Sequence, residues 1–166
     1  MKRKIIIILS ILIVTATILA FLFINKTNSM ATVYVDPQTT EKVVGQDFTV
    51  NVSVSDVVNL YGWEFKLGWN FTILEFVNAT EGTFLKSGGS TFFTYMLNVT
   101  GSYVLVDCTL LGNIAGAKGN GVLASIQFRV KESGVCDLDL YDTKLEDPSE
   151  EMLTHTTNGG RLTANP

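Results

Sequence analysis

The amino-acid sequence predicts an all-β protein, a nine-stranded antiparallel β-sandwich preceded by an N-terminal transmembrane or signal helix. Three observations lead to this prediction. A run of uncharged, mostly apolar residues occupies positions 5–24. After it, apolar residues recur at every second position in short runs that glycine, asparagine and aspartate separate, which is typical of strands with one buried face. Beyond residue 31 no apolar stripe with helical spacing continues for three turns, so we expect only single helical turns there.

The apolar run at positions 5–24 is long enough to cross the hydrocarbon core of a bilayer as a helix. Lys2, Arg3 and Lys4 precede it. Basic residues on this side predict that the N-terminus stays in the cytoplasm and that the rest of the chain lies outside. We therefore divide the chain into a signal peptide or signal-anchor transmembrane helix, residues 1–31, and a β-sandwich domain, residues 32–166.

The leader has two possible fates. Its apolar run is longer than a usual signal-peptide core, which favours an uncleaved anchor that holds the domain at the cell surface. The segment Ser29-Met30-Ala31 has the small-x-small pattern of a cleavage site. Secretion after cleavage behind Ala31 is therefore the alternative.

The strands follow the leader in nine runs. Four show strict alternation over seven or more residues, and the third is the clearest, because Tyr61, Trp63, Phe65, Leu67 and Trp69 alternate with small or charged residues. The remaining runs are shorter. The predicted strands are 32–36, 48–54, 61–69, 73–77, 91–99, 103–110, 122–130, 136–141 and 160–164. We expect a long loop over the glycine-rich residues 112–121 and a tight turn at Asn158-Gly159-Gly160.

Charge separates the two parts of the chain. The leader holds four of the 12 basic residues and none of the 16 acidic ones, which leaves the domain with a formal charge of −8. Such a domain has no affinity for nucleic-acid phosphates. An acidic surface suits basic partners, divalent cations or solubility outside the cell.

Sequons and cysteines agree with export. The domain carries four Asn-x-Ser/Thr sequons, which predict glycosylation at Asn51, Asn70, Asn78 and Asn98. It has two cysteines, Cys108 and Cys136. Two cysteines permit one disulfide but do not frame a fold.

The order of these features resembles the cohesin domain. Three segments carry the resemblance. Phe65-Lys-Leu-Gly-Trp-Asn-Phe-Thr-Ile-Leu-Glu-Phe76 is similar to the family's F-x-x-x-Y-D-P-x-x-L-E segment, Gly121-Val-Leu-Ala-Ser-Ile-Gln-Phe128 to its G-x-L-x-x-I-x-F strand, and Asn158-Gly-Gly-Arg-Leu162 to its closing x-G-G-x-V. The resemblance implies a jelly-roll sandwich whose 8-3-6-5 sheet face docks the calcium-loaded helices of a dockerin. It also implies that calcium belongs to the partner and that this chain needs no cofactor or metal.

The chain departs from the family pattern at two places. Asn70-Phe71 stands where the family has Asp-Pro, and Gly62-Trp63-Glu64 stands where the family has Asn-x-Asp on the third strand. The second change keeps one acceptor on the docking face and loses the other. The family's strand order also implies that Cys108 and Cys136 lie on either side of the third strand, about 9.5 Å apart. That is too far for a disulfide, so we expect two free thiols.

Strand parity defines the residues expected to bind the partner. They point away from the core of the third, fifth and sixth strands, and they combine apolar area with a few polar anchors, as docking surfaces require. This set is Glu64, Lys66, Phe92, Thr94, Met96, Tyr103, Leu105, Asp107 and Thr109. The alternative is that a bulge shifts the parity by one, so that Phe92, Met96, Tyr103 and Leu105 belong to the core.

Other chemistry has weaker support. The aromatic row at 61–69 resembles a sugar-stacking platform, but its regular alternation favours a core position. Residues 146–151 form an acidic run without the spacing of a calcium loop, which favours a solvated turn. The single histidine, His155, has no nucleophile context, and nothing marks a cleft around Glu64 and Asp107, so we expect no enzyme.

The leading hypothesis is therefore a surface-displayed tethering module for dockerin-like partners, with a role in polysaccharide breakdown. Two alternatives remain open. One is a carbohydrate-binding module on the same fold, with polysaccharide as the partner. The other is a structural or adhesive protein of the cell envelope.

Overall fold

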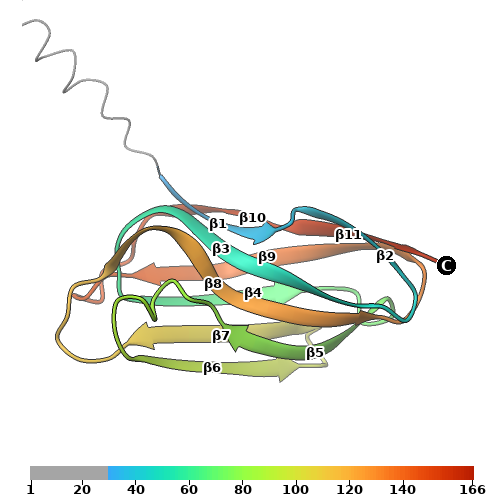
Figure 1. Cartoon of the computed structure of the whole chain (residues 1–166), viewed down its shortest axis with the longest axis horizontal. Coiled ribbons are helices and arrows are strands. Elements are labelled where there is room, and N and C mark those ends of the chain that lie inside the picture. The colour runs from blue at the N-terminus through green and yellow to red at the C-terminus, as the bar shows by residue number, and fades with distance from the viewer. Residues whose placement is uncertain (1–29) are drawn as a thin grey trace, which may run out of the picture.

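The computed structural model describes residues 30–166, which form eleven strands and no helix (Figure 1). The predicted leader helix lies outside the described residues. Within residues 30–166 no helix is long and apolar enough to cross a membrane. The strands are β1 (Ala31–Asp36), β2 (Thr39–Val43), β3 (Asp47–Leu60), β4 (Gly62–Gly68), β5 (Leu74–Glu81), β6 (Thr91–Asn98), β7 (Tyr103–Leu110), β8 (Ala117–Val130), β9 (Gly134–Glu146), β10 (His155–Asn158) and β11 (Gly160–Asn165).

The strands form two sheets that face each other across one core. The first sheet has the order β10-β1-β3-β8-β5, and the second has the order β2-β11-β9-β4-β7-β6. Figure 1 shows the long strands β3 and β8 of the first sheet passing in front of β9 and β4 of the second. The predicted all-β sandwich is confirmed.

Alternating side chains from both sheets fill the core. Along β4, Trp63, Phe65 and Leu67 are buried, and along β8, Ile126 and Phe128 meet them from the opposite sheet. Each such side chain contributes about 1.5–3 kcal/mol when it is removed from water. The period-two pattern of the sequence therefore matches the burial of the strands, and the core forms as predicted.

The prediction of nine antiparallel strands is wrong in number and in direction. The structure adds β2 and β10, and two pairs are parallel, β1 with β10 and β2 with β11. The reason is that the first and last strand segments each switch sheets. The first leaves one sheet at Asp36-Pro37, which is a cis peptide, and continues in the other as β2. The last does the same between β10 and β11.

Glycine is required where the last segment switches sheets. A Cβ atom on Gly159 would lie 2.6 Å from the carbonyl oxygen of Leu138, and one on Gly160 would lie 2.8 Å from a methyl group of Val35. Side chains at either position would push the two sheets apart. The Asn158-Gly159-Gly160 segment is therefore a crossing between sheets, where the sequence suggested only a tight turn.

The glycine-rich loop is shorter than predicted. Strand β8 begins at Ala117, so only residues 111–116 remain between β7 and β8. The start of β8 pairs with the end of β3 in an irregular register, with shifts after Val54 and Val57. Such bulges break the alternation from which strands are predicted.

Candidate docking face

Four strands lie side by side in the second sheet, in the order β9-β4-β7-β6. We call their outer surface the docking face. The pairing register arranges its side chains in four rows across the strands. In the order β9, β4, β7, β6, the rows are Glu146, Gly62, Thr109, Phe92; then Lys144, Glu64, Asp107, Thr94; then Tyr141, Lys66, Leu105, Met96; and finally Asp139, Gly68, Tyr103, Asn98.

All nine residues predicted from strand parity lie on this one face. The pairing of β6 with β7 has no register shift, so the alternative of a parity slip is wrong here. Phe92 and Met96 are each 57% exposed, whereas Phe93 between them packs against the core. At the end of β7, Leu110 is buried and Leu111 is exposed. Whether these nine residues bind a partner stays a proposal.

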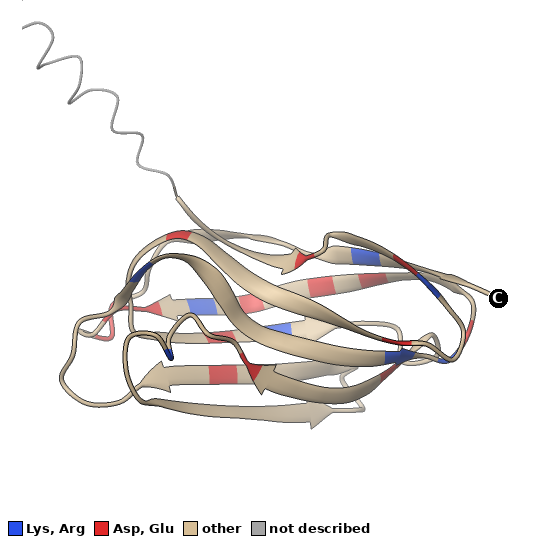
Figure 2. Ribbon diagram, in the orientation of Figure 1, with Lys and Arg blue, Asp and Glu red and all other residues tan. Residues whose placement is uncertain are grey.

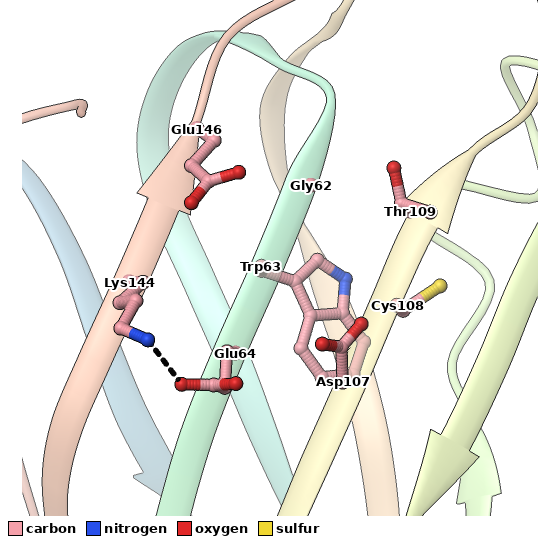
Figure 3. Close-up of a pocket in the computed structure, with 8 residues that line it drawn as sticks. All are labelled: Gly62, Trp63, Glu64, Asp107, Cys108, Thr109, Lys144 and Glu146. Carbon is pink, nitrogen blue, oxygen red and sulfur yellow. Dashed lines mark ion pairs between the residues drawn. The ribbon is translucent and has the colours of Figure 1, made fainter. Parts of the chain in front are cut away.

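One half of the face is acidic. Lys144 forms an ion pair with Glu64, with 2.7 Å between Nζ and Oε1. Figure 3 shows this pair beside Asp107, with Glu146 and Thr109 further along the same surface. Within residues 30–166 Asp107 has no ion pair of its own. Burial raises the pKa of the Asp107 carboxyl, Glu64 and Glu146 raise it further, and Lys144 lowers it.

Gly62 leaves a gap in this acidic half. The gap belongs to a pocket of about 280 Å³ lined by Gly62, Trp63, Glu64, Asp107, Cys108, Thr109, Lys144 and Glu146 (Figure 3). A Cβ atom on Gly62 would lie 3.5 Å from Oγ1 of Thr109, an ordinary contact. A side chain would therefore fit at this position, and its absence leaves space between the carboxylates of Glu64, Asp107 and Glu146.

The other half of the face is aromatic and apolar. Tyr103 and Tyr141 meet edge to face, with 6.3 Å between ring centroids. Nζ of Lys66 lies 5.1 Å from the Tyr103 centroid and forms an ion pair with Asp142 at 2.9 Å. Met96 lies beside Leu105 in the same row. Apolar area therefore lies next to fixed charge, the combination found in the buried centre and rim of protein interfaces.

The contribution of β9 to the docking face was not predicted from the sequence. The sequence pattern predicted a strand over 136–141 and a separate acidic run, whereas β9 continues to Glu146 and places Tyr141, Lys144 and Glu146 on the face. A register shift opposite Phe65 and the left-handed backbone of Asp142 (φ 47°) interrupt the alternation. Leu145 is buried beyond this bulge and was the available sign that the strand continues.

Three of the aromatic residues that suggested a sugar-stacking platform are buried. Trp63, Phe65 and Trp69 are buried, and Nε1 of Trp69 donates a hydrogen bond to the Leu74 carbonyl at 3.2 Å. Trp69 packs edge to face on Phe128 of the opposite sheet. These rings fill the core, so they cannot stack on a sugar at the surface.

The other candidate groups have structural roles. Cys108 and Cys136 are both free and buried, as expected, because they lie on β7 and near the start of β9 with β4 between those strands. Burial and the nearby Glu81 raise the pKa of Cys108 to about 12, so its thiol stays protonated and unreactive. His155 bonds through both ring nitrogens, to Thr143 and to the Leu153 carbonyl.

The acidic run 146–151 and the segment at Asn70 both form turns that are held by their own side-chain hydrogen bonds. In the run 146–151, the Asp147 carboxylate accepts hydrogen bonds from the amides of Ser149 and Glu151, which makes it a turn rather than a calcium loop. No group of residues suited to a metal occurs within residues 30–166. At the Asp-Pro position of the cohesin pattern, Asn70 accepts from the Thr72 amide at 2.9 Å and replaces the aspartate as the turn-forming acceptor.

The four sequons of the domain differ in surroundings. Asn70 and Asn78 are exposed, and Asn51 and Asn98 are half-buried. Nδ2 of Asn98 donates to the Tyr103 hydroxyl at the edge of the docking face. Glycosylation at each of them stays a prediction.

A comparison with known families identifies the chain. The family profile of the cohesin domain matches residues 33–160. The chain belongs to the cohesin family. Cohesin domains are non-catalytic binding modules.

Solved cohesins share the fold at low sequence identity. A non-cellulosomal cohesin from the hyperthermophilic archaeon Archaeoglobus fulgidus is 20% identical, with a TM-score of 0.68 over 83% of this chain and 93% of that one. The cohesin of a type I cohesin–dockerin complex from Clostridium thermocellum is 14% identical, with a TM-score of 0.70 over 82% and 100%. A type II cohesin from Acetivibrio cellulolyticus is 13% identical, with a TM-score of 0.67 over 81% and 95%. A search of curated protein sequences returned no match.

Proposed function

We propose that this cohesin binds a dockerin-like module through its docking face and so tethers that partner to the cell surface. The observation that carries the proposal is the exposure of Phe92 and Met96 on the outer face of β6, beside Leu105 and the acidic pocket. Packing within the domain gives no reason for these exposed apolar side chains. Several similar structures are cohesin–dockerin complexes, which supports the same class of partner.

The two halves of the face make different contacts in this proposal. The apolar half, around Met96 and Leu105, supplies area that is removed from water when a helix packs on it. The acidic half, around Asp107 and Glu146, accepts a cationic side chain of the partner. The calcium of the complex is carried by the partner, and this chain supplies no cofactor. The partner is a protein that acts on polysaccharide or another surface protein.

The test measures binding of a calcium-loaded dockerin, from the same secretome, to immobilised cohesin. Truncation of Leu105 or Met96 to Ala is expected to weaken binding by on the order of 1–2 kcal/mol, roughly 5- to 30-fold, because anchor residues lose buried contact area. The free energy of unfolding should change by less than about 1 kcal/mol, since both sites are at the surface.

Val135→Ala is the matched control. Val135 is exposed on the outer surface of β9, where that strand pairs with β11 outside the four rows. Its truncation should leave binding unchanged. If Leu105→Ala and Met96→Ala bind as tightly as the parent while their stability is also unchanged, this face is not the site. Binding of polysaccharide by the parent, in place of a dockerin, would favour the carbohydrate-binding alternative.

A further inference from the structure

The sandwich has four sheet edges, formed by β10 and β5 in one sheet and by β2 and β6 in the other. An edge strand presents a row of backbone N–H and C=O groups without strand partners. Folded proteins usually protect such edges with charge, bulges, proline or short length, since an unprotected edge pairs with another chain.

Three of the four edges carry such protection. Strand β2 has Glu41 and Lys42 among its five residues. Strand β10 is only four residues long. Strand β5 has a register shift after Phe76 and carries Glu75 and Glu81.

Strand β6 carries none of them. Its eight residues, Thr-Phe-Phe-Thr-Tyr-Met-Leu-Asn, include no charge, proline or glycine, and its pairing with β7 is regular throughout. Figure 2 shows β6 without a charged residue, while β4, β7 and β9 of the same sheet carry several. Apolar side chains are exposed on both of its faces, Phe92 and Met96 outward and Tyr95 and Leu97 toward β5.

We propose that β6 pairs antiparallel with β6 of a second copy of this chain, which joins the two second sheets edge to edge. A register centred on Thr94 is self-complementary. It sets Phe92 of one copy opposite Met96 of the other on the outer face, and Phe93 opposite Tyr95 on the inner face. Large apolar side chains then meet directly across the new strand pair, where cross-strand contacts stabilise a sheet.

The lack of charge on β6 permits a second copy at this edge. Two copies, each with a formal charge of −8 on the domain, repel wherever their acidic surfaces approach. The neutral strip of β6 is the edge at which they meet without opposing like charges. An apolar groove lined by Phe71, Leu74, Phe76, Leu97 and Val99 lies beside the C-terminal end of β6.

This inference does not depend on dockerin binding. In the paired state the docking faces of both copies lie on one continuous sheet and point the same way. Phe92 and Met96 would then lie at the centre of a double face, so that two partners dock side by side.

Cysteine cross-linking of the full chain in lipid vesicles tests the pairing. Directly opposed residues of antiparallel strands have Cα atoms about 4.5–5.5 Å apart, within the range of a disulfide. Thr94→Cys should therefore form covalent dimers at least about tenfold faster than a control cysteine under copper-catalysed oxidation by dissolved oxygen. The native thiols are buried and do not compete. Thr39→Cys is the control, since Thr39 is exposed on β2 at the opposite edge of the same sheet.

A second arm tests the register. Copies with Phe92→Cys mixed with copies carrying Met96→Cys should cross-link to each other faster than either variant cross-links to itself. Equal rates for Thr94→Cys and Thr39→Cys would overturn the pairing. Self-linking of Phe92→Cys that exceeds the mixed product would overturn the register centred on Thr94. Neither result bears on dockerin binding, which is measured separately.

Discussion

At the scale of single residues, Asp107 is a half-buried carboxylate of the docking face with acidic neighbours. It lies opposite Glu64 on β4 and opposite Thr94 on β6. The nearest lysine of this row, Lys144, is paired with Glu64. Burial, Glu64 and Glu146 together raise the pKa of the Asp107 carboxyl above its ordinary value of 3.8. The folded domain therefore favours the protonated form more than the unfolded chain does, so the charged form costs some stability.

Replacement of Asp107 by Asn should make stability less dependent on pH. Because the folded-state pKa is raised, the stabilising contribution of Asp107 is fully present below the unfolded pKa, near 3.8, and is lost as pH rises through the raised folded value. Asp107→Asn should therefore be more stable than the parent at neutral pH, by on the order of 0.5–1 kcal/mol after solvent screening. Urea unfolding at a series of pH values measures it.

Asp139→Asn is the matched control, because Asp139 is an exposed carboxylate on the same face. The difference between the two variants should grow as pH rises above 3.8. If a cationic side chain of the bound partner lay beside Asp107, it would stabilise the charged carboxylate. The parent would then be the more stable protein at neutral pH. If Asp107→Asn is less stable than the parent at neutral pH, the carboxylate has a partner of its own and the acidic pocket is already satisfied.

At the scale of strands, Glu81 connects the two sheets at the edge where β5 faces β6. Its side chain is only 9% exposed, although it carries charge. It accepts a hydrogen bond from Thr91 of β6 at 2.7 Å, pairs with Lys86 at 3.1 Å, and lies 3.6 Å from Sγ of Cys108 on β7. One carboxylate thus ties the end of a strand in the first sheet to two strands of the second.

Glu81→Ala should lower the free energy of unfolding by about 2 kcal/mol, because it removes a charge-assisted hydrogen bond and leaves the half-buried hydroxyl of Thr91 without its acceptor. Chemical unfolding of the two proteins measures the difference. The control is Glu75→Ala, an exposed position on the same strand, which should change stability by less than about 1 kcal/mol. Equal effects at the two positions would mean that Glu81 does not connect the sheets.

The strands that could be predicted from the sequence are those that bury one face. β7 was predicted with its observed bounds, and β4 to within one residue at each end, because Phe65, Leu67, Val104 and Val106 alternate without interruption. The nine residues of the docking face followed from the same alternation. β2 and β10 could not be found this way, since an edge strand of mixed polar residues is held by backbone pairing and leaves no apolar period.

Bulges account for the remaining differences. β9 bends at Asp142, so the spacing between Leu140 and Leu145 is odd and the two halves of one strand looked like a strand and an acidic run. The start of β8 was hidden in the same way by its irregular pairing with β3. A bulge changes which residues face outward without changing composition, so a pattern of period two cannot cross it.

At the scale of the whole molecule, the predicted membrane span lies close to the folded domain in the sequence. Met30 directly precedes β1, so residues 25–30 alone separate the predicted span from the fold. Six residues reach at most about 22 Å when extended. An uncleaved leader would therefore hold the sandwich close to the membrane surface. A cytoplasmic N-terminus and an external domain stay a prediction from the basic residues before the apolar run.

The full chain, expressed in a cell that exports it, should remain in the membrane after extraction with alkaline carbonate, and its N-terminal peptide should include residues before Thr32. The physical reason is the length of the apolar run at 5–24, which is long enough for a helix to span a bilayer core. Leu12→Lys should weaken retention, because a lysine at the centre of a span costs about 2.5–3.5 kcal/mol. Leu105→Lys provides the control for an added charge outside the leader. A mature protein that begins at Thr32 and is released to the medium would contradict the anchor and would make this cohesin a secreted module, whose tethering then requires a second attachment to the cell.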